Sequence, residues 1–179
     1  MDEVSVFRLW MMRAGFVLLV LLLLFFHLLP LETTPRRWAG PDLVLCFAFA
    51  WVLRRPEYTP VPMVAVLFLI CDLLLGRPPG LHAALSLIAF NYLAARNLSI
   101  RNMPFSVEWI MVSIALVAVM LGHRLILSLL LINAPGAGLL ASQIITNILA
   151  YPVVVLISRY ALGLRAVTLG SVNALGQRQ

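Results

Sequence analysis

The sequence predicts an all-α, polytopic membrane protein, in which 179 residues form a single domain, a bundle of six transmembrane helices. Three observations lead to this prediction. Apolar residues make up 63% of the chain and the mean hydropathy is +1.02, whereas soluble domains are roughly 45–50% apolar. All 13 basic residues are arginines, and most stand at the ends of apolar runs, where they anchor helices at a membrane surface. Short polar segments, several of them rich in proline or glycine, divide these runs.

The first apolar run, residues 14–30, follows Arg8 and Arg13. A secretory signal peptide begins in a similar way, but no small-residue cleavage site follows this run, and further apolar runs do. The run is therefore predicted to be the first span. Because residues 17–26 include no polar side chain, we expect most of the surface of this helix to face lipid.

The second span is predicted at residues 41–53. Proline suits the first turn of a helix, and a carboxylate is favourable at the positive end of the helix dipole, so Pro41 and Asp42 mark the start. This apolar run is short for a membrane span, which takes about 20 helical residues. We therefore expect the helix to extend back to Trp38 and forward into the arginine pair that follows.

The third and fourth spans are predicted at residues 63–75 and 81–95. Three prolines between residues 56 and 62 exclude a helix that continues from the second span. The turn between the third and fourth spans, residues 76–80, reads Gly-Arg-Pro-Pro-Gly. Because these spans are short and their turns are tight, we expect the second, third and fourth spans to pack as adjacent antiparallel helices.

The fifth and sixth spans are predicted at residues 105–121 and 139–162. Residues 96–104, which precede them, are polar and predicted to be a loop. The apolar piece at residues 125–132 is too short to cross a bilayer, which needs about 20 helical residues. It is either an interfacial helix or the continuation of a tilted fifth span.

The distribution of arginines predicts the orientation of the chain. With six spans, the arginines divide into nine on one side and four on the other. The positive-inside rule assigns the larger group to the cytoplasm, so both termini are predicted to be cytoplasmic. The nine are Arg8, Arg13, Arg54, Arg55, Arg96, Arg101, Arg159, Arg165 and Arg178, and the four are Arg36, Arg37, Arg77 and Arg124.

Asp72 is the clearest charged residue inside a predicted span. A charge at a helix centre costs roughly 2.5–3.5 kcal/mol on insertion scales, so this carboxylate needs a reason. Arg77 and His82 are its nearest possible partners in sequence. It is either a proton or cation site, or a helix-terminating carboxylate hydrogen-bonded to a neighbouring helix or loop. We favour the second interpretation because no other carboxylate shares its depth; Asp42 lies at the membrane boundary, where a helix-start role suffices.

The sixth span carries a polar stripe. Gln143, Asn147 and Tyr151 are spaced four apart and therefore share one helix face. Pro152 follows the stripe and is expected to loosen the helix backbone there. Such side chains commonly form hydrogen bonds between helices, each contributing roughly 0.6–2 kcal/mol, and this interpretation is favoured over a ligand pocket. Asn91 of the fourth span is expected to join the stripe.

The sequence contains no arrangement typical of an active site. Nucleophile–base arrangements, phosphate-binding loops and metal-ligand spacings are all missing from it, so we predict neither an enzyme nor a bound cofactor or metal. Cys46 and Cys71 lie within apolar runs and are predicted to be buried hydrophobic residues. Glu108, near Arg101, is explained by its place in the first turn of the fifth span. The sequence contains no basic patch interleaved with aromatic residues, so we do not predict nucleic-acid binding.

The order of motifs in residues 41–95 resembles that of MreD, the family of rod-shape-determining membrane proteins. That family has a proline-led second helix with a tryptophan near its end, a basic turn with proline, an aspartate and glycine closing the third helix, and a glycine opening the fourth. The last helix is similar too, with an asparagine followed by an aromatic residue and proline. One departure is the stretch at residues 64–68, which lacks the glycines often found there in the family. The matching residues are Pro41, Asp42, Trp51, Arg55, Pro56, Asp72, Gly76, Gly80, Asn147, Tyr151 and Pro152.

This resemblance implies a non-catalytic scaffold of the machinery that elongates the cell wall, in the inner membrane of a bacterium. Similar proteins bind MreC, and through it work with RodA, its penicillin-binding transpeptidase and, indirectly, MreB filaments. The family is also similar in fold to the substrate-binding subunits of energy-coupling-factor transporters. The alternative is therefore a vitamin-type binding subunit, with a pocket lined by the polar stripe and Asn91 and with Asp72 at its periplasmic opening.

Overall fold

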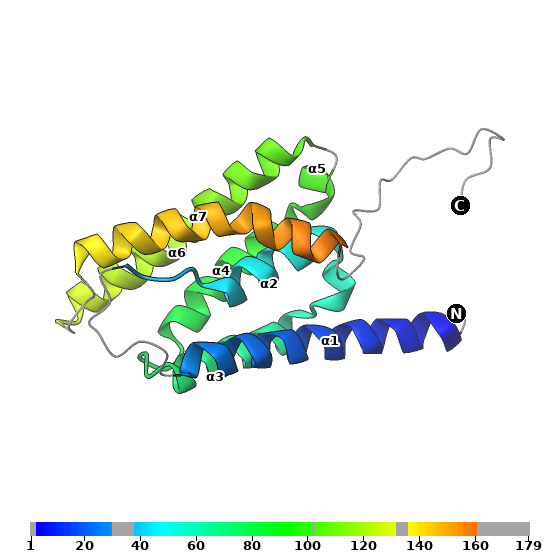
Figure 1. The fold of residues 1–179 in the computed structure, drawn as a ribbon, viewed down its shortest axis with the longest axis horizontal. Coiled ribbons are helices and arrows are strands. Elements are labelled where there is room, and N and C mark those ends of the chain that lie inside the picture. Colours follow the sequence, from blue (N-terminus) through cyan, green and yellow to red (C-terminus); the bar gives the residue numbers. More distant parts are fainter. Residues whose placement is uncertain (1–2, 30–37, 102, 132–135, 161–179) are drawn as a thin grey trace.

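All regular structure in the described part of the chain is helical, as predicted. The computed structural model describes residues 3–29, 38–101, 103–131 and 136–160 (Figure 1). A 3-10 turn, η1, lies between the second and third helices. The elements in chain order are α1 (Glu3–Leu28), α2 (Leu43–Arg54), η1 (Pro56–Tyr58), α3 (Val61–Leu74), α4 (Leu81–Ala95), α5 (Asn97–Arg101), α6 (Phe105–Leu129) and α7 (Ala137–Tyr160).

Three helices are long and apolar enough to cross a membrane, namely α1 from Val6 onward, α6 and α7. They correspond to the predicted first, fifth and sixth spans. Because α6 is continuous to Leu129, most of the apolar piece at residues 125–132 belongs to the same helix as the fifth predicted span. The last residue of this piece, Ile132, and the last two residues of the predicted sixth span, 161–162, lie outside the described residues. The helices α2, α3 and α4 are apolar but shorter, with 12, 14 and 15 residues.

Helix α2 forms the centre of the bundle. Every residue from Leu45 to Arg54 is buried. Its most extensive contacts are with α7 and α4, and α5, η1 and α1 contact it as well. A helix that is apolar on all sides must be enclosed either by lipid or by protein, and α2 is enclosed by protein.

Helix α1 lies at the side of the bundle, along the lower edge in Figure 1. Only Phe16, Val20 and Leu24 of its apolar run are buried, and their spacing of four forms one narrow stripe. Phe16 packs its ring against Trp51 of α2, with centroids 5.0 Å apart. The remaining faces of the run are largely exposed, in agreement with the prediction that most of this helix faces away from the protein.

The start of α2 differs from the prediction. Trp38 lies outside the helix and is 68% exposed, so the expected extension back to it is wrong. Asp42 is instead the N-cap, and its Oδ1 accepts the backbone N–H of Leu45 at 3.2 Å. An N-cap residue has non-helical backbone angles, and its side chain replaces the missing helical hydrogen bond. The helix therefore cannot continue back through Asp42 and Pro41.

The turn between α3 and α4 depends on two glycines with positive φ, Gly76 at +63° and Gly80 at +86°. At the end of α3, the N–H of Arg77 bonds to the carbonyl of Asp72 at 3.0 Å, and that of Gly76 bonds to Leu73 at 3.4 Å. This pair of bonds closes a helix through a left-handed residue, a conformation that glycine adopts without steric cost. The turn returns the chain so that α4 packs on α3.

Two expectations about neighbouring segments need correction. Helix α4 lies between α2 and α3, whereas α2 has its most extensive contacts with α7, so the second to fourth spans are not one simple antiparallel row. Residues 96–104 are not all loop, since they contain the short helix α5. Its first residue, Asn97, is buried and donates from Nδ2 to the carbonyl of Val52 at 3.3 Å. This long-range bond helps to dock α5 against α2.

Candidate functional site

The carboxylate of Asp42, at the N-terminal end of the central helix α2, has partners on several neighbouring elements. Asp42 Oδ2 lies 3.6 Å from a guanidinium nitrogen of Arg77 and 3.5 Å from Nε2 of His82. Its backbone N–H donates to Oδ1 of Asn147 at 2.6 Å. Asp42 therefore joins α2 to the α3–α4 turn, to α4 and to α7. From the sequence, Arg77 and His82 were expected as partners of Asp72, but both lie against Asp42.

Asp72 has a different environment. Its side chain is fully buried at the end of α3, and Oδ2 accepts two backbone N–H groups, from Gly80 at 3.1 Å and Ala83 at 2.9 Å. The first N–H groups of a helix have no partner within it, and Gly80, the N-cap of α4, has no side chain to supply one. The carboxylate of Asp72 thus caps the neighbouring helix, as the helix-terminating interpretation describes.

The polar face of α7 is turned into the bundle. Asn147 and Tyr151 are fully buried, and Gln143 is partly buried one turn earlier. Two neighbouring side chains of α7, Thr146 beside the predicted stripe and Ser142, which was not predicted, bond to Ala39: Ser142 accepts its N–H at 3.1 Å, and Thr146 donates to its carbonyl at 3.2 Å. The spacing of four between Ser142 and Thr146 is the signal that could have revealed them. Together with Asn147, they hold residues 39–42 against α7.

Asn91 does not join the polar face of α7. It is exposed on α4, whose inward side is formed by His82, Ser86, Phe90 and Leu93. The expected contact is therefore wrong. Residues 90 and 93 are buried while residue 91 points outward, because consecutive helical residues are about 100° apart around the axis.

A second buried polar group lies at the C-terminal end of α2. Arg54 donates to Oε1 of Glu108 at 2.9 Å and to the carbonyl of Ala50 at 3.1 Å. The hydroxyl of Tyr151 donates to the same Glu108 oxygen at 2.6 Å. This triad joins α2, α6 and α7. From the sequence, Glu108 and Arg54 were interpreted as unrelated residues near the ends of two different spans. No local pattern in the sequence relates positions 54, 108 and 151.

Pro152 lies within α7, and the helix continues through it. A proline has no N–H, so the carbonyl four residues earlier, that of Ile148, loses its helical partner. The indole Nε1 of Trp109 on α6 donates to this carbonyl at 3.0 Å. The break in the hydrogen-bond ladder of α7 is thereby filled from the neighbouring helix.

A double-mutant cycle tests this arrangement. Trp109→Phe should cost about 1–2 kcal/mol of stability, because it leaves the Ile148 carbonyl without a partner. In a Pro152→Ala background the new N–H of residue 152 can bond to that carbonyl, so the same change should cost less than half as much. The measurement is the unfolding free energy of the four proteins in detergent micelles. The volume lost from the tryptophan is the same in both backgrounds and therefore cancels in the comparison. Equal losses of stability in the two backgrounds would contradict the bond between Trp109 and the Ile148 carbonyl.

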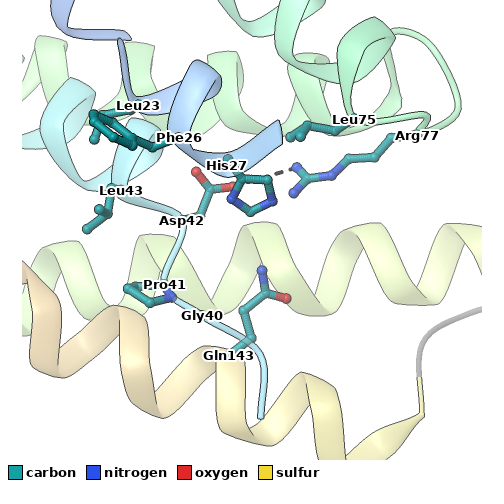
Figure 2. A pocket seen from close by; sticks show the side chains of 10 residues that line it. All are labelled: Leu23, Phe26, His27, Gly40, Pro41, Asp42, Leu43, Leu75, Arg77 and Gln143. Carbon is teal, nitrogen blue, oxygen red and sulfur yellow. Dashed lines mark ion pairs between the residues drawn. The ribbon is translucent and has the colours of Figure 1, made fainter. Parts of the chain in front are cut away.

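A cavity of about 270 Å³ opens beside Asp42, between the ends of α1 and α3 and the start of α2 and α7 (Figure 2). Figure 2 shows the side chains of His27, Asp42, Arg77 and Gln143 converging on it. A smaller cavity of about 20 Å³, the size of a single water molecule, lies behind it near Ser86, and the Asp42–Arg77 pair lines both. The apolar wall of the larger cavity consists of Leu23, Phe26, Leu43 and Leu75.

The larger cavity can bind a polar group through its donor groups. The described residues contain no cluster of three or more His, Cys, Asp or Glu side chains that could hold a metal ion. Of the predicted site residues, Pro41, Asp42 and Gln143 line the cavity, and Asn147 is bonded to Asp42. Asp72, Gly76 and Gly80 belong to the nearby turn, and Tyr151 and Pro152 lie deeper along α7. No protein-family model, curated protein or solved structure matches this chain.

Proposed function

We propose that this protein is a non-catalytic scaffold of the MreD type in the cell-wall elongation machinery of a bacterial inner membrane. The observation that carries the proposal is the convergence of six of the eleven residues on which the resemblance rests. Pro41 and Asp42 precede α2, Asp72 and the two turn glycines join α3 to α4, and Asn147 lies on α7. These residues belong to distant parts of the chain, yet Asp42 bonds to Asn147 of α7 and pairs with Arg77. Arg77 lies in the α3–α4 turn, and Asp72 caps the helix that follows this turn.

A six-span topology is supported by the dimensions of the second span. The 12 residues of α2 are about 18 Å long at 1.5 Å per residue. Residues 39–42, which lead into it as a non-helical segment (Figure 1), add up to about 13 Å. The sum is close to the roughly 30 Å of a bilayer core. Non-helical backbone at membrane depth is tolerated when protein satisfies its polar groups, and Ser142, Thr146 and Asn147 do so here.

The contacts at the two ends of the bundle also support the proposed orientation. Arg13 donates to the carbonyl of Glu57 at 3.2 and 3.1 Å, so the N-terminal part of α1 lies beside η1 and the end of α2. The opposite end of α1 lines the cavity together with Arg77. Arginines assigned to the cytoplasm and to the periplasm therefore lie at opposite ends, in accord with the positive-inside rule. Both termini are cytoplasmic in this proposal.

As a scaffold, the protein binds the single transmembrane helix of MreC on the outer face of α1, and through MreC works with RodA, its penicillin-binding transpeptidase and MreB filaments. Two faces are candidates for this contact, the outer face of α1 and the polar stripe of α7. The central part of the stripe is inaccessible, because Asn147 and Tyr151 are fully buried. Helix α1 instead exposes Leu18, Leu22 and Phe25 on successive turns.

The test is a mild-detergent pull-down of the tagged protein from its native membranes, with retained proteins identified by mass spectrometry. Recovery of MreC with RodA and its transpeptidase is expected. A triple variant of α1, Leu18→Ala, Leu22→Ala and Phe25→Ala, should lose MreC. The matched control is the pair Ile110→Ala and Ile114→Ala on α6, which are also exposed and should retain it. Failure to recover MreC with the unmodified protein would overturn the proposal.

The alternative function, a small-molecule binding subunit of a vitamin-type transporter, is favoured by one observation, the convergence of polar side chains on the cavity beside Asp42. Its volume of about 270 Å³ is slightly below the roughly 300–1,000 Å³ typical of ligand pockets. Moreover, of the residues expected to line it from the fourth and sixth spans, Gln143 does so, but Asn91 is exposed and Tyr151 is bonded to Glu108. Recovery of an ATPase pair and a coupling subunit in the same pull-down would establish this alternative.

A further inference from the structure

The cavity beside Asp42 has a polar side and an apolar side. Its apolar wall includes Leu23 and Phe26, which lie on the last turns of α1, and His27 follows directly. The long apolar run of α1 ends at this point, so the cavity lies where a membrane-spanning helix leaves the hydrocarbon layer. A molecule bound there would place a polar group toward Arg77 and an apolar part along α1.

The polar groups that remain free in the cavity are mainly hydrogen-bond donors. Asp42 is already engaged, since Oδ1 accepts the N–H of Leu45 and Oδ2 faces Arg77 and His82. Arg77 uses a single nitrogen in that pair, at the long distance of 3.6 Å, whereas a guanidinium carries five N–H donors. Within the described chain, the side chains of Gln143 and His27 make no hydrogen bond.

A phosphate group is the complement of these donors. Its oxygens only accept hydrogen bonds when ionised, and a guanidinium presents two parallel N–H groups to them. The charge of Asp42 is paired with that of Arg77, so it does not leave the cavity strongly negative. The phosphate of an anionic phospholipid and free inorganic phosphate share this chemistry.

The size and position of the cavity favour the lipid. A volume of about 270 Å³ is enough for a phosphate and the glycerol joined to it. A complete phospholipid does not fit. Its acyl chains would lie outside the cavity, in the surrounding hydrocarbon layer. Free phosphate would leave the apolar wall of Leu23 and Phe26 uncovered.

We infer that this cavity is a binding site for the phosphate headgroup of an anionic phospholipid. Arg77 and Gln143 contact the phosphate, His27 lies at its edge, and the acyl chains extend from the cavity into the hydrocarbon layer. The site does not depend on the scaffold role, because it requires only that α1 spans the membrane.

The experiment uses the full chain purified in detergent and washed free of lipid, with thermal unfolding followed by tryptophan fluorescence. At tenfold excess over Kd, phosphatidylglycerol in mixed micelles should raise Tm by about 3–6 °C. Phosphatidylcholine should give a smaller rise, and inorganic phosphate none at the same concentration. Arg77→Gln and Gln143→Leu should each lose most of the shift. Arg96→Gln should keep it, because Arg96 stacks on Tyr92 at the far end of α4.

Each outcome decides the inference. If Arg77→Gln fails to fold because Asp42 loses its partner, Gln143→Leu still tests the site, since no hydrogen bond from its side chain to the described residues is lost. A full shift in both variants would show that lipid binds elsewhere. No shift in the unmodified protein would overturn the site altogether. A full shift with inorganic phosphate alone would overturn the lipid and assign the cavity to a soluble anion.

Discussion

Glu108→Ala should lower the free energy of unfolding by about 3–5 kcal/mol, the range observed when one member of a buried ion pair is removed. Glu108 accepts hydrogen bonds from both Arg54 and Tyr151, and the side chains of Arg54 and Glu108 are only 9% and 15% exposed. Without the carboxylate, the guanidinium keeps one bond, to Ala50, and its charge is left without a counterion in the bundle centre. The measurement is reversible unfolding in mixed micelles.

The control for this prediction removes both charges at once. The double variant Arg54→Met and Glu108→Leu should lose much less stability than Glu108→Ala, because replacing a whole buried pair by apolar side chains is often close to neutral. Tyr151→Phe, which removes one hydrogen bond and leaves the ion pair, should cost about 1–2 kcal/mol. If the double variant lost as much stability as Arg54→Met and Glu108→Leu lose together as single variants, the coupling would be contradicted.

Asp72→Ala should cost about 3 kcal/mol of stability. The carboxylate accepts the N–H groups of both Gly80 and Ala83. Removing a helix N-cap costs roughly 0.5–2 kcal/mol, and each buried donor left without a partner adds roughly 1–3 kcal/mol. The two effects overlap, so the total is less than their sum. The same unfolding measurement applies.

Two variants separate capping from charge. Asp72→Asn keeps one oxygen that can accept both N–H groups, so it should lose about half as much stability as Asp72→Ala. Ser86→Ala is the matched control on α4: its hydroxyl is also buried but has no hydrogen-bond partner among the described residues, and its loss should be nearly neutral. If Asp72→Asn were as harmful as Asp72→Ala, the charge of Asp72 rather than its position would be what matters.

Features that depend on short stretches of sequence could be predicted. The all-α class and the long helices α1, α6 and α7 follow from uninterrupted apolar runs, and the bounds of α4 agree with the predicted 81–95. Asp42 was recognised as the start of a helix because capping is a local effect between a side chain and the N–H groups of the next three residues. The glycine turn was recognised for the same reason.

Features that depend on how helices pack could not be predicted. The apolar runs of α1 and α2 look alike in sequence, yet one is largely exposed and the other is central, because composition does not distinguish lipid from protein as the surrounding medium. The prediction assigned Arg77 to Asp72, which is closer to it in sequence, whereas the turn between α3 and α4 brings Arg77 back to Asp42. The triad of Arg54, Glu108 and Tyr151 unites three helices and leaves no local trace.

The bonds between α7 and residues 39–42 have a consequence for biosynthesis. In the proposed six-span topology the lead-in to α2 lies at membrane depth, but the side chains that bond to its backbone, Ser142, Thr146 and Asn147, are synthesised after every other described helix. Unsatisfied backbone groups at membrane depth cost several kcal/mol each. In this topology the nascent chain keeps this segment in contact with water or with the insertion machinery until α7 arrives. The contacts between α7 and the lead-in to the central helix α2 are therefore the last to form.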